Sequence, residues 1–159
     1  DIMSEDWGAN NDLLGWHKWK LGWLDAAQVR CATGSGSTEY ALTPLAREGG
    51  PKLVFVPLDH RSGYAVELRT REGNDESVCR PGVLVYKVDA DVDTGMGPMK
   101  VHDAKQDSGG CTRSPNVHAE LSDAAFVPGE EFRDEKRGVR VAVLEADITG
   151  SYRVRVTRE

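Results

Sequence analysis

The sequence lacks features that would indicate a membrane protein or a nucleic-acid-binding protein. No apolar run approaches the ~18 residues that a transmembrane helix needs, so we expect no membrane span. Basic residues are also fewer than acidic ones: the sequence has 20 Lys and Arg residues and 26 Asp and Glu residues. The resulting formal net charge of −6 does not provide the basic surface that binds phosphate backbones. We therefore expect no nucleic-acid partner.

Cysteine and histidine are scarce, and neither shows the spacing of a zinc site. The three cysteines include no Cys-x-x-Cys pair, and the four histidines form no His-Glu-x-x-His motif. The sequence therefore predicts no zinc ligands within this chain.

A leader segment is missing as well. The chain opens with Asp1-Ile-Met3-Ser4, without an initiator methionine and without a charged segment followed by an apolar one. We therefore expect this sequence to be a piece of a longer protein. Its 159 residues, of which 39% are hydrophobic, are nevertheless enough to form one domain-sized core without a structural metal.

Two of the three cysteines lie in turn-like contexts. Cys79 is followed by Arg-Pro-Gly, and Cys111 is preceded by Ser-Gly-Gly. Loop cysteines of this kind are typical of disulfides in secreted proteins, so we predict a Cys79–Cys111 bond and an extracellular location. Cys31 is then either buried and free or bonded to a segment outside this chain. The alternative is a cytosolic protein with three reduced cysteines.

The segment 10–24 has the pattern of an amphipathic helix. Trp16, Trp19 and Trp23 follow the i, i+3, i+7 spacing that places side chains on one helical face. Asn10 or Asn11 can serve as the N-cap, with Asp12 in the first turn, and Gly22 is placed to end the helix. We expect the tryptophan face to pack against a body of protein. That body is either a part of the polypeptide outside this chain or an ordinary core of this domain.

Beyond Gln28 the apolar residues recur with the period of two that is typical of strands. Five strong candidate strands and three weaker ones follow: 52–57, 64–71, 83–89, 139–144 and 152–157, then 29–32, 39–43 and 99–102. The sequence thus predicts a mainly β fold, with one N-terminal α-helix followed by an antiparallel β-sandwich or open barrel of about eight strands. We expect residues 103–137, rich in Asp, Ser, Gly and Pro, to form a long surface excursion.

A short run around Ser108 is similar to a nucleophile motif. Asp107-Ser108-Gly109-Gly110 resembles the Gly-Asp-Ser-Gly-Gly run of trypsin-like serine proteases, but Gln106 replaces the leading glycine. A catalytic triad also needs a histidine held by a buried carboxylate, and His60 lacks the small-residue context of that family's histidine. The pattern therefore favours a turn-forming loop over a nucleophile.

Three carboxylates alternate in one connecting segment. Asp89, Asp91 and Asp93 occupy every second position, as ligands do in calcium-binding loops. An EF-hand is excluded because Lys100 stands where that loop has its glutamate. The candidates are a calcium site of another type or a solvated acidic connection between two strands.

The first 25 residues resemble a known family of secreted peptidases. Asp1-Ile-Met3-Ser4, followed by Trp16-His-Lys-Trp19-Lys-Leu-Gly22-Trp23-Leu, is similar to the segment after the zinc-binding motif in metallopeptidases of the immune inhibitor A type. That family is peptidase family six and is metzincin-like. A second run, Glu67-Leu-Arg69 through Gly73-Asn-Asp75 to Gly82-Val-Leu-Val-Tyr86, resembles the family's Glu-x-Arg, Gly-x-Asp and Gly-Val-Leu-Ile-Tyr motifs. The resemblance covers residues 1–25 and 63–104, and loosely the final strands.

The resemblance implies a division of the chain. Residues 1–25 would be the Met-turn and Trp-rich helix at the end of a catalytic domain, and residues 26–159 a C-terminal all-β domain. Met3 would pack beneath the zinc without binding it, because a thioether is a poor zinc ligand. The zinc ligands and the general-base glutamate would lie upstream of Asp1, in the catalytic domain that is the expected partner.

The chain would then be the C-terminal fragment of a secreted zinc metalloendopeptidase that cleaves proteins or peptides, and it would be inactive alone. The alternative is a stand-alone extracellular β-sandwich that binds a protein, a carbohydrate or calcium. A serine protease with Ser108 as its nucleophile is the third hypothesis. If the tryptophan face packs on a catalytic domain, some of Trp16, Trp19 and Trp23 will form an exposed apolar patch. If the domain stands alone, all three will be buried.

Overall fold

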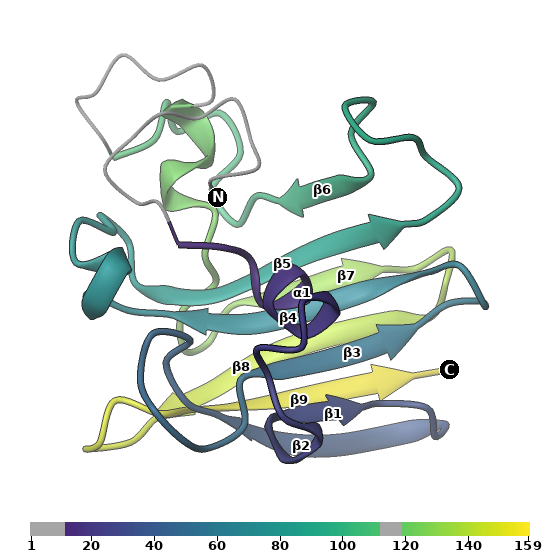
Figure 1. The fold of residues 1–159 in the computed structure, drawn as a ribbon, viewed down its shortest axis with the longest axis horizontal. Helices are drawn as coiled ribbons and strands as arrows, with labels where there is room; N and C mark the ends of the chain where they lie inside the picture. Colours follow the sequence, from purple (N-terminus) through teal and green to yellow (C-terminus); the bar gives the residue numbers. More distant parts are fainter. Residues whose placement is uncertain (1–11, 112–118) are drawn as a thin grey trace.

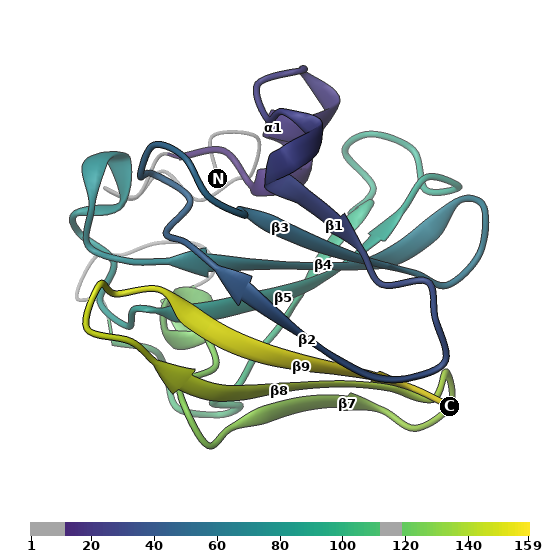
Figure 2. The same ribbon diagram turned by 90° about the horizontal axis from the view of Figure 1, so that it is seen from below.

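The computed structural model describes residues 12–111 and 119–159. These residues form two β-sheets, of five and four strands, that face each other, together with one short α-helix (Figures 1 and 2). The mainly β fold with one N-terminal helix is thus confirmed. Of the two expected architectures, the described part of the chain adopts the sandwich, and its sheets do not close into a barrel.

The first sheet contains the strands that carry most of the predicted chemistry. Its strand order is β1-β3-β4-β5-β6, with β1 parallel to β3 and the remaining pairs antiparallel. The bounds are β1 (Val29–Cys31), β3 (Leu53–Pro57), β4 (Ser62–Arg69), β5 (Gly82–Asp89) and β6 (Met99–His102). Two 3-10 turns flank these strands: η1 (Ala26–Gln28) before β1 and η2 (Gly73–Asp75) between β4 and β5.

The second sheet is wholly antiparallel, with the order β2-β9-β8-β7. Its strands are β2 (Gly36–Leu42), β7 (Glu131–Asp134), β8 (Val139–Ala146) and β9 (Tyr152–Arg158). A tight turn joins β8 to β9, and within it the Asp147 amide donates to the Ser151 carbonyl over 2.8 Å. This hairpin connects the last two of the predicted strands.

The core lies between the two sheets and is formed by the apolar residues that recur at every second position of the strands. Alternate residues of each strand point inward, as Val141 and Val143 do on β8 and Val154 and Val156 on β9. All four are at most 2% exposed. Burying a valine side chain contributes roughly 1.5–3 kcal/mol, so this alternation provides most of the drive to form the sandwich.

The N-terminal helix is shorter than the predicted 10–24 segment. Helix α1 spans only Gly15–Lys20, while Asn10 and Asn11 lie outside the described residues. Gly22 ends it as expected: with φ at +74°, it lets the Trp23 amide donate to the Lys18 carbonyl over 2.8 Å. Asp12 precedes the helix, so its placement in the first turn was wrong. Its carboxylate instead contacts the Lys18 ammonium at 2.7 Å.

The predicted surface excursion over 103–137 is also partly wrong. This stretch contains the 3-10 turn η3 (Ala119–Asp123) and the strand β7, and its residues Phe126 and Phe132 are each only 6% exposed. Both rings belong to the core between the sheets. Strand β7 has four residues, three of them charged, so its sequence shows no apolar alternation that would predict a strand.

A second apolar cluster covers the outer face of the first sheet, the face turned away from the second sheet. Leu53, Ala65, Tyr86 and Val88 belong to it and are at most 3% exposed. Helix α1 lies on this face as a partial third layer (Figure 2). In the described part of the chain, no helix is long and apolar enough to cross a membrane.

Candidate functional site

A group of buried polar side chains lies on the outer face of the first sheet, beneath α1. Glu67 and Arg69 project from β4, Tyr86 from β5 and Asp75 from η2, and none of the four is more than 8% exposed. We call these four residues the buried clamp. Arg69 connects its members, donating to Glu67 Oε1 over 2.9 Å and to Asp75 Oδ1 over 2.5 Å. Glu67 and Arg69 share a face because they are two residues apart on a strand.

The buried clamp holds the main chain at the start of α1. The Gly15 amide donates to Glu67 Oε2 over 2.7 Å, and the Trp16 amide donates to the Tyr86 hydroxyl over 3.0 Å. That hydroxyl in turn donates to Glu67 Oε2 over 2.7 Å. The first amides of a helix have no partner within it, and here side chains of the sheet provide their acceptors.

Gly15 allows this close approach. A Cβ atom at position 15 would lie 2.7 Å from Glu67 Oε2 and 3.4 Å from a Leu45 methyl group. Any other residue would therefore force the helix and the Glu67 carboxylate apart. The glycine, rather than a helix-forming residue, starts α1 because the acceptor lies directly against the backbone.

The charges of the buried clamp do not cancel, because two carboxylates face one guanidinium. Burial raises the pKa of Asp75, although Arg69 opposes the shift. One Asp75 oxygen, Oδ2, is buried without a hydrogen-bond partner. Burial disfavours the charge of Arg69, but Glu67 and Asp75 outweigh this and raise its pKa. Burial, reinforced by the charge of Glu67, also raises the pKa of Tyr86.

The three tryptophans of the predicted stripe have different surroundings. Trp16 stacks on Phe55 of β3 with ring centroids 4.9 Å apart, and Trp19 contacts Trp16 edge-on at 5.4 Å. Both are half-buried against the outer face of the first sheet. Trp23, by contrast, is 64% exposed, and its neighbour Leu21 is 57% exposed. We call Leu21 and Trp23 the exposed apolar patch.

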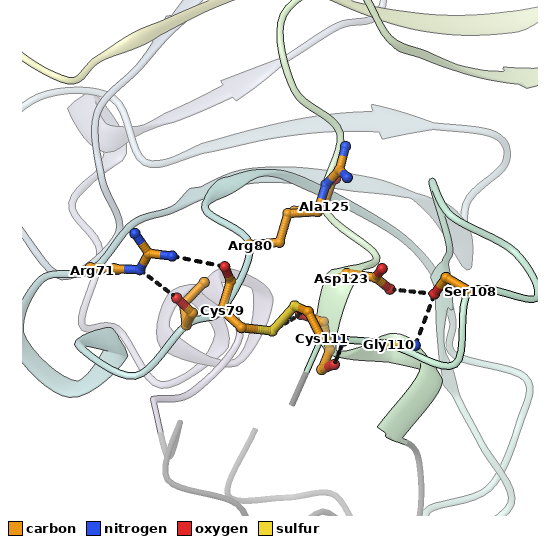
Figure 3. The surroundings of a disulfide bond; sticks show 10 residues. Arg71, Cys79, Arg80, Ser108, Gly110, Cys111, Asp123 and Ala125 are labelled. Atoms are coloured by element: carbon orange, nitrogen blue, oxygen red, sulfur yellow. Dashed lines mark hydrogen bonds between the residues drawn. A yellow bond between two sulfur atoms is a disulfide. The ribbon is translucent and has the colours of Figure 1, made fainter. Parts of the chain in front are cut away.

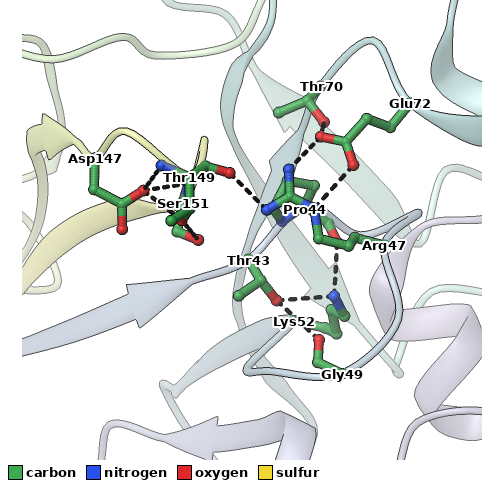
Figure 4. A network of polar contacts seen from close by, with 10 residues as sticks. All are labelled: Thr43, Pro44, Arg47, Gly49, Lys52, Thr70, Glu72, Asp147, Thr149 and Ser151. Carbon is green, nitrogen blue, oxygen red and sulfur yellow. Dashed lines mark hydrogen bonds and ion pairs between the residues drawn. The ribbon is translucent and has the colours of Figure 1, made fainter.

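A second polar network joins three loops at one end of the sandwich (Figure 4). Arg47 makes a double contact with the Glu72 carboxylate, at 2.6 and 3.0 Å, and donates to the Thr149 carbonyl at 2.7 Å. Nearby, the Lys52 ammonium donates to the Thr43 hydroxyl and the Pro44 carbonyl, each at 2.8 Å. Lys52 is only 1% exposed, and burial lowers its pKa to about 8.

A disulfide joins Cys79 to Cys111, the pairing that their turn-like contexts favour (Figure 3). It fastens the β6–η3 connection to the loop before β5, over 32 residues of sequence. Arg71 braces the same loop by donating to the Val78 and Cys79 carbonyls at 2.9 and 2.8 Å. Cys31 is free and exposed on β1, so the first of its two expected states, a buried free thiol, is wrong. Strand β1 lies at the edge of its sheet, where this side chain meets solvent.

Ser108 stabilises a turn. Its hydroxyl donates to Asp123 Oδ1 over 3.1 Å and accepts from the Gly110 amide over 2.9 Å (Figure 3). Asp107 has a positive φ of 60°, which is typical of a tight turn. These contacts fit the turn-forming loop that the sequence favours over a nucleophile.

Two of the three candidate calcium ligands pair with cations, and the third, Asp93, is exposed. Asp89 accepts from Lys87 over 2.8 Å, which lowers the Asp89 pKa, and Asp91 pairs with Arg61. Among residues 12–111 and 119–159, no three His, Cys, Asp or Glu side chains come together as a group that could hold a metal ion. Met3 lies outside the described residues.

Sequence reasoning named some residues of the buried clamp without their role and missed others. Glu67, Arg69 and Asp75 stood out only as parts of motifs that resemble a family. The sequence pattern predicts no role for Gly15 or the Tyr86 hydroxyl, and it places Lys52 only as the first residue of a strand. A polar pair within an otherwise apolar strand, such as Glu67 and Arg69, is the signal that could have indicated a buried network.

Comparisons with known proteins leave the family open: no protein-family model, no curated protein and no solved structure matched this chain.

Proposed function

We propose that this chain is the C-terminal part of a secreted zinc-dependent metalloendopeptidase, and that the upstream catalytic domain of the same polypeptide packs on α1. The observation that carries the proposal is the exposed apolar patch. Trp23 and Leu21 project from the end of α1 with more than half of their surface exposed. Exposed apolar surface marks sites where another protein body binds, and these two large side chains, two residues apart in sequence, support such a site here.

The outer face of the first sheet supports the same conclusion. A sheet of a free-standing sandwich has one face in the core and one in water, and the second face is polar. Here the outer face of the first sheet carries an apolar cluster beside the buried clamp, and the partly buried side chains Phe55, Leu84, Met99 and Val101 pack into that cluster. An apolar outer cluster of this kind supports a sandwich that is covered by more protein than α1 alone.

The buried clamp supports the proposal in a second way. Glu67, Arg69 and Asp75 belong to the motifs that resemble immune inhibitor A-type peptidases, and all three act together on the segment that follows the resembling Met-turn sequence. The disulfide between Cys79 and Cys111 supports an extracellular location, where such bonds persist.

The role of this chain in the peptidase would be structural. The catalytic zinc, its ligands and the general base would belong to the upstream domain, where the metal would activate a water for peptide-bond hydrolysis. The sandwich would supply a rigid body, and α1 would supply the surface on which the catalytic domain is fastened.

The test uses the complete polypeptide that the gene encodes. We expect a His-Glu-x-x-His motif upstream of Asp1, and hydrolysis of casein that 1,10-phenanthroline abolishes and added zinc restores. Replacing both Leu21 and Trp23 by serine should lower the thermal stability of the complete polypeptide but not that of the 159-residue chain. The matched control is Ile148→Ser, because Ile148 is fully exposed on the opposite sheet's hairpin. An upstream region without the motif, or casein hydrolysis that is insensitive to the chelator, would refute the proposal.

The stand-alone binding module is the second candidate, and the closed core between the two sheets favours it. That core is complete within the described residues, as its many side chains below 7% exposure indicate. A signal peptide directly preceding Asp1 in the gene, together with a ligand whose binding depends on Trp23, would establish this function instead.

A further inference from the structure

Helix α1 is too short to be stable without contacts to the rest of the protein. It has six residues, whereas isolated helices below about 12–15 residues are marginal in water. Its N-cap position is occupied by Leu14, which makes no capping hydrogen bond through its side chain. The position of α1 on the sheet is therefore set by contacts from outside the helix.

The buried clamp provides these contacts from parts of the chain that are distant in sequence. Glu67 lies 52 residues from Gly15, and Tyr86 lies 70 residues from Trp16. A carboxylate that accepts from an amide and a hydroxyl in a buried site forms hydrogen bonds stronger than neutral ones. Arg69 adds a third contact by donating to the Leu13 carbonyl over 3.3 Å.

We infer that the buried clamp is an orientation lock: it fixes the direction of the backbone at residues 13–16 relative to the sandwich, and so fixes the orientation that α1 presents to a protein body packing on this helix. Glu67, Arg69 and Tyr86 are positioning residues in this inference. The lock itself stands on contacts among the described residues. Only the identity of the locked body, a catalytic domain, rests on the proposed function.

The competing explanation is that aromatic packing alone holds the helix, since Trp16 stacks on Phe55. The two explanations differ at the Tyr86 hydroxyl. Tyr86→Phe preserves the buried ring and its apolar contacts, and it removes only the acceptor of the Trp16 amide and one donor to Glu67. A change at α1 in this variant is therefore due to the polar contacts.

The experiment is amide hydrogen exchange, measured residue by residue by NMR on the 159-residue chain. In Tyr86→Phe we expect the Trp16 amide to exchange at least about 10-fold faster, because it loses its buried acceptor. The Gly15 amide should also exchange faster, because its acceptor Glu67 loses the hydrogen bond from the Tyr86 hydroxyl. The amides of Val54 and Val66, at the centre of the first sheet, should exchange no more than about 3-fold faster.

The matched control is Tyr64→Phe. Tyr64 is a buried tyrosine on β4 whose hydroxyl donates to Asp134, on the face opposite α1. The Tyr64→Phe substitution should not accelerate amide exchange at Gly15 and Trp16 more than at Val66. The lock is overturned if Tyr86→Phe leaves the two amides at wild-type rates, or if it accelerates all of these amides equally.

A second variant, Glu67→Gln, tests the charge of the lock. The Gly15 amide should again exchange faster while the Val141 amide, in the second sheet, keeps its protection. If Glu67→Gln unfolds the chain, the Tyr86→Phe result alone decides. In the complete polypeptide, Tyr86→Phe should lower kcat several-fold with KM unchanged. Faster amide exchange with unchanged kcat would support the lock and count against the proposed function, which separates the two.

Discussion

The two faces of the first sheet are stabilised by different interactions. The inner face, against the second sheet, is closed by apolar side chains such as Val66 and Leu68, both fully buried. The outer face buries Glu67 and Arg69 on the same strand, and every residue of β4 is buried as a result. The inner face gains its stability from area removed from water, whereas the outer face depends on each polar group having a partner. The second kind of surface tolerates less change, but it fixes the position of what lies on it.

The largest expected effect comes from breaking the charge pairing of the outer face. Arg69→Met leaves Glu67 and Asp75 buried without their cation, so we expect the free energy of unfolding to fall by about 4 kcal/mol. Chemical denaturation measures it. The control is Arg155→Met, whose partner Glu39 is exposed, and it should cost less than about 1 kcal/mol. Equal decreases in the free energy of unfolding in the two variants would show that the ion pairs of the buried clamp contribute no more to stability than an exposed ion pair.

Removal of the disulfide is expected to have the next largest effect. Replacing Cys79 and Cys111 by serine removes a cross-link over 32 residues, which should lower the free energy of unfolding by about 3–4 kcal/mol. The reduced wild-type chain should behave like the double variant in the same denaturation experiment. Because Cys31 is free and exposed, Cys31→Ser is the control and should change stability by less than about 0.5 kcal/mol. A loss in the control as large as that in the double variant would assign the effect to something other than the cross-link.

A buried lysine gives the chain a predictable dependence on pH. Burial lowers the pKa of Lys52 in the folded state to about 8, while the unfolded chain titrates near the ordinary value of 10.5. Between these values the unfolded state binds more protons, so stability rises with pH. We expect a gain of about 2 kcal/mol from pH 8 to pH 10.

The measurement for Lys52 is denaturation across that pH range. Lys52→Met removes the titrating group and should flatten the rise, whereas the exposed Lys20→Met should leave it intact. A rise that persists in Lys52→Met would assign the pH dependence to another group.

Period and turn chemistry account for what the sequence could predict. All eight candidate strands occur because apolar alternation matches a two-sided environment, as in β8 and β9. Strand β7 was missed because Phe132 is its only apolar residue. The buried clamp could not be derived from local pattern. Whether Glu67 faces water or protein depends on α1, which lies 52 residues away in sequence and covers it.

The smallest expected change in stability comes from the exposed apolar patch. It distinguishes an aromatic ring that is exposed in this chain from one that is packed against the sheet. Trp23→Ser should leave the free energy of unfolding of this chain within about 0.5 kcal/mol of wild type, because the side chain is already 64% exposed. Trp16→Ser, in contrast, should cost about 3 kcal/mol, since it removes the ring stacked on Phe55. Denaturation followed by far-ultraviolet circular dichroism compares the two without depending on tryptophan fluorescence. A loss above 1 kcal/mol in Trp23→Ser would mean that this ring already packs within the chain, and the patch would no longer need a partner to explain it.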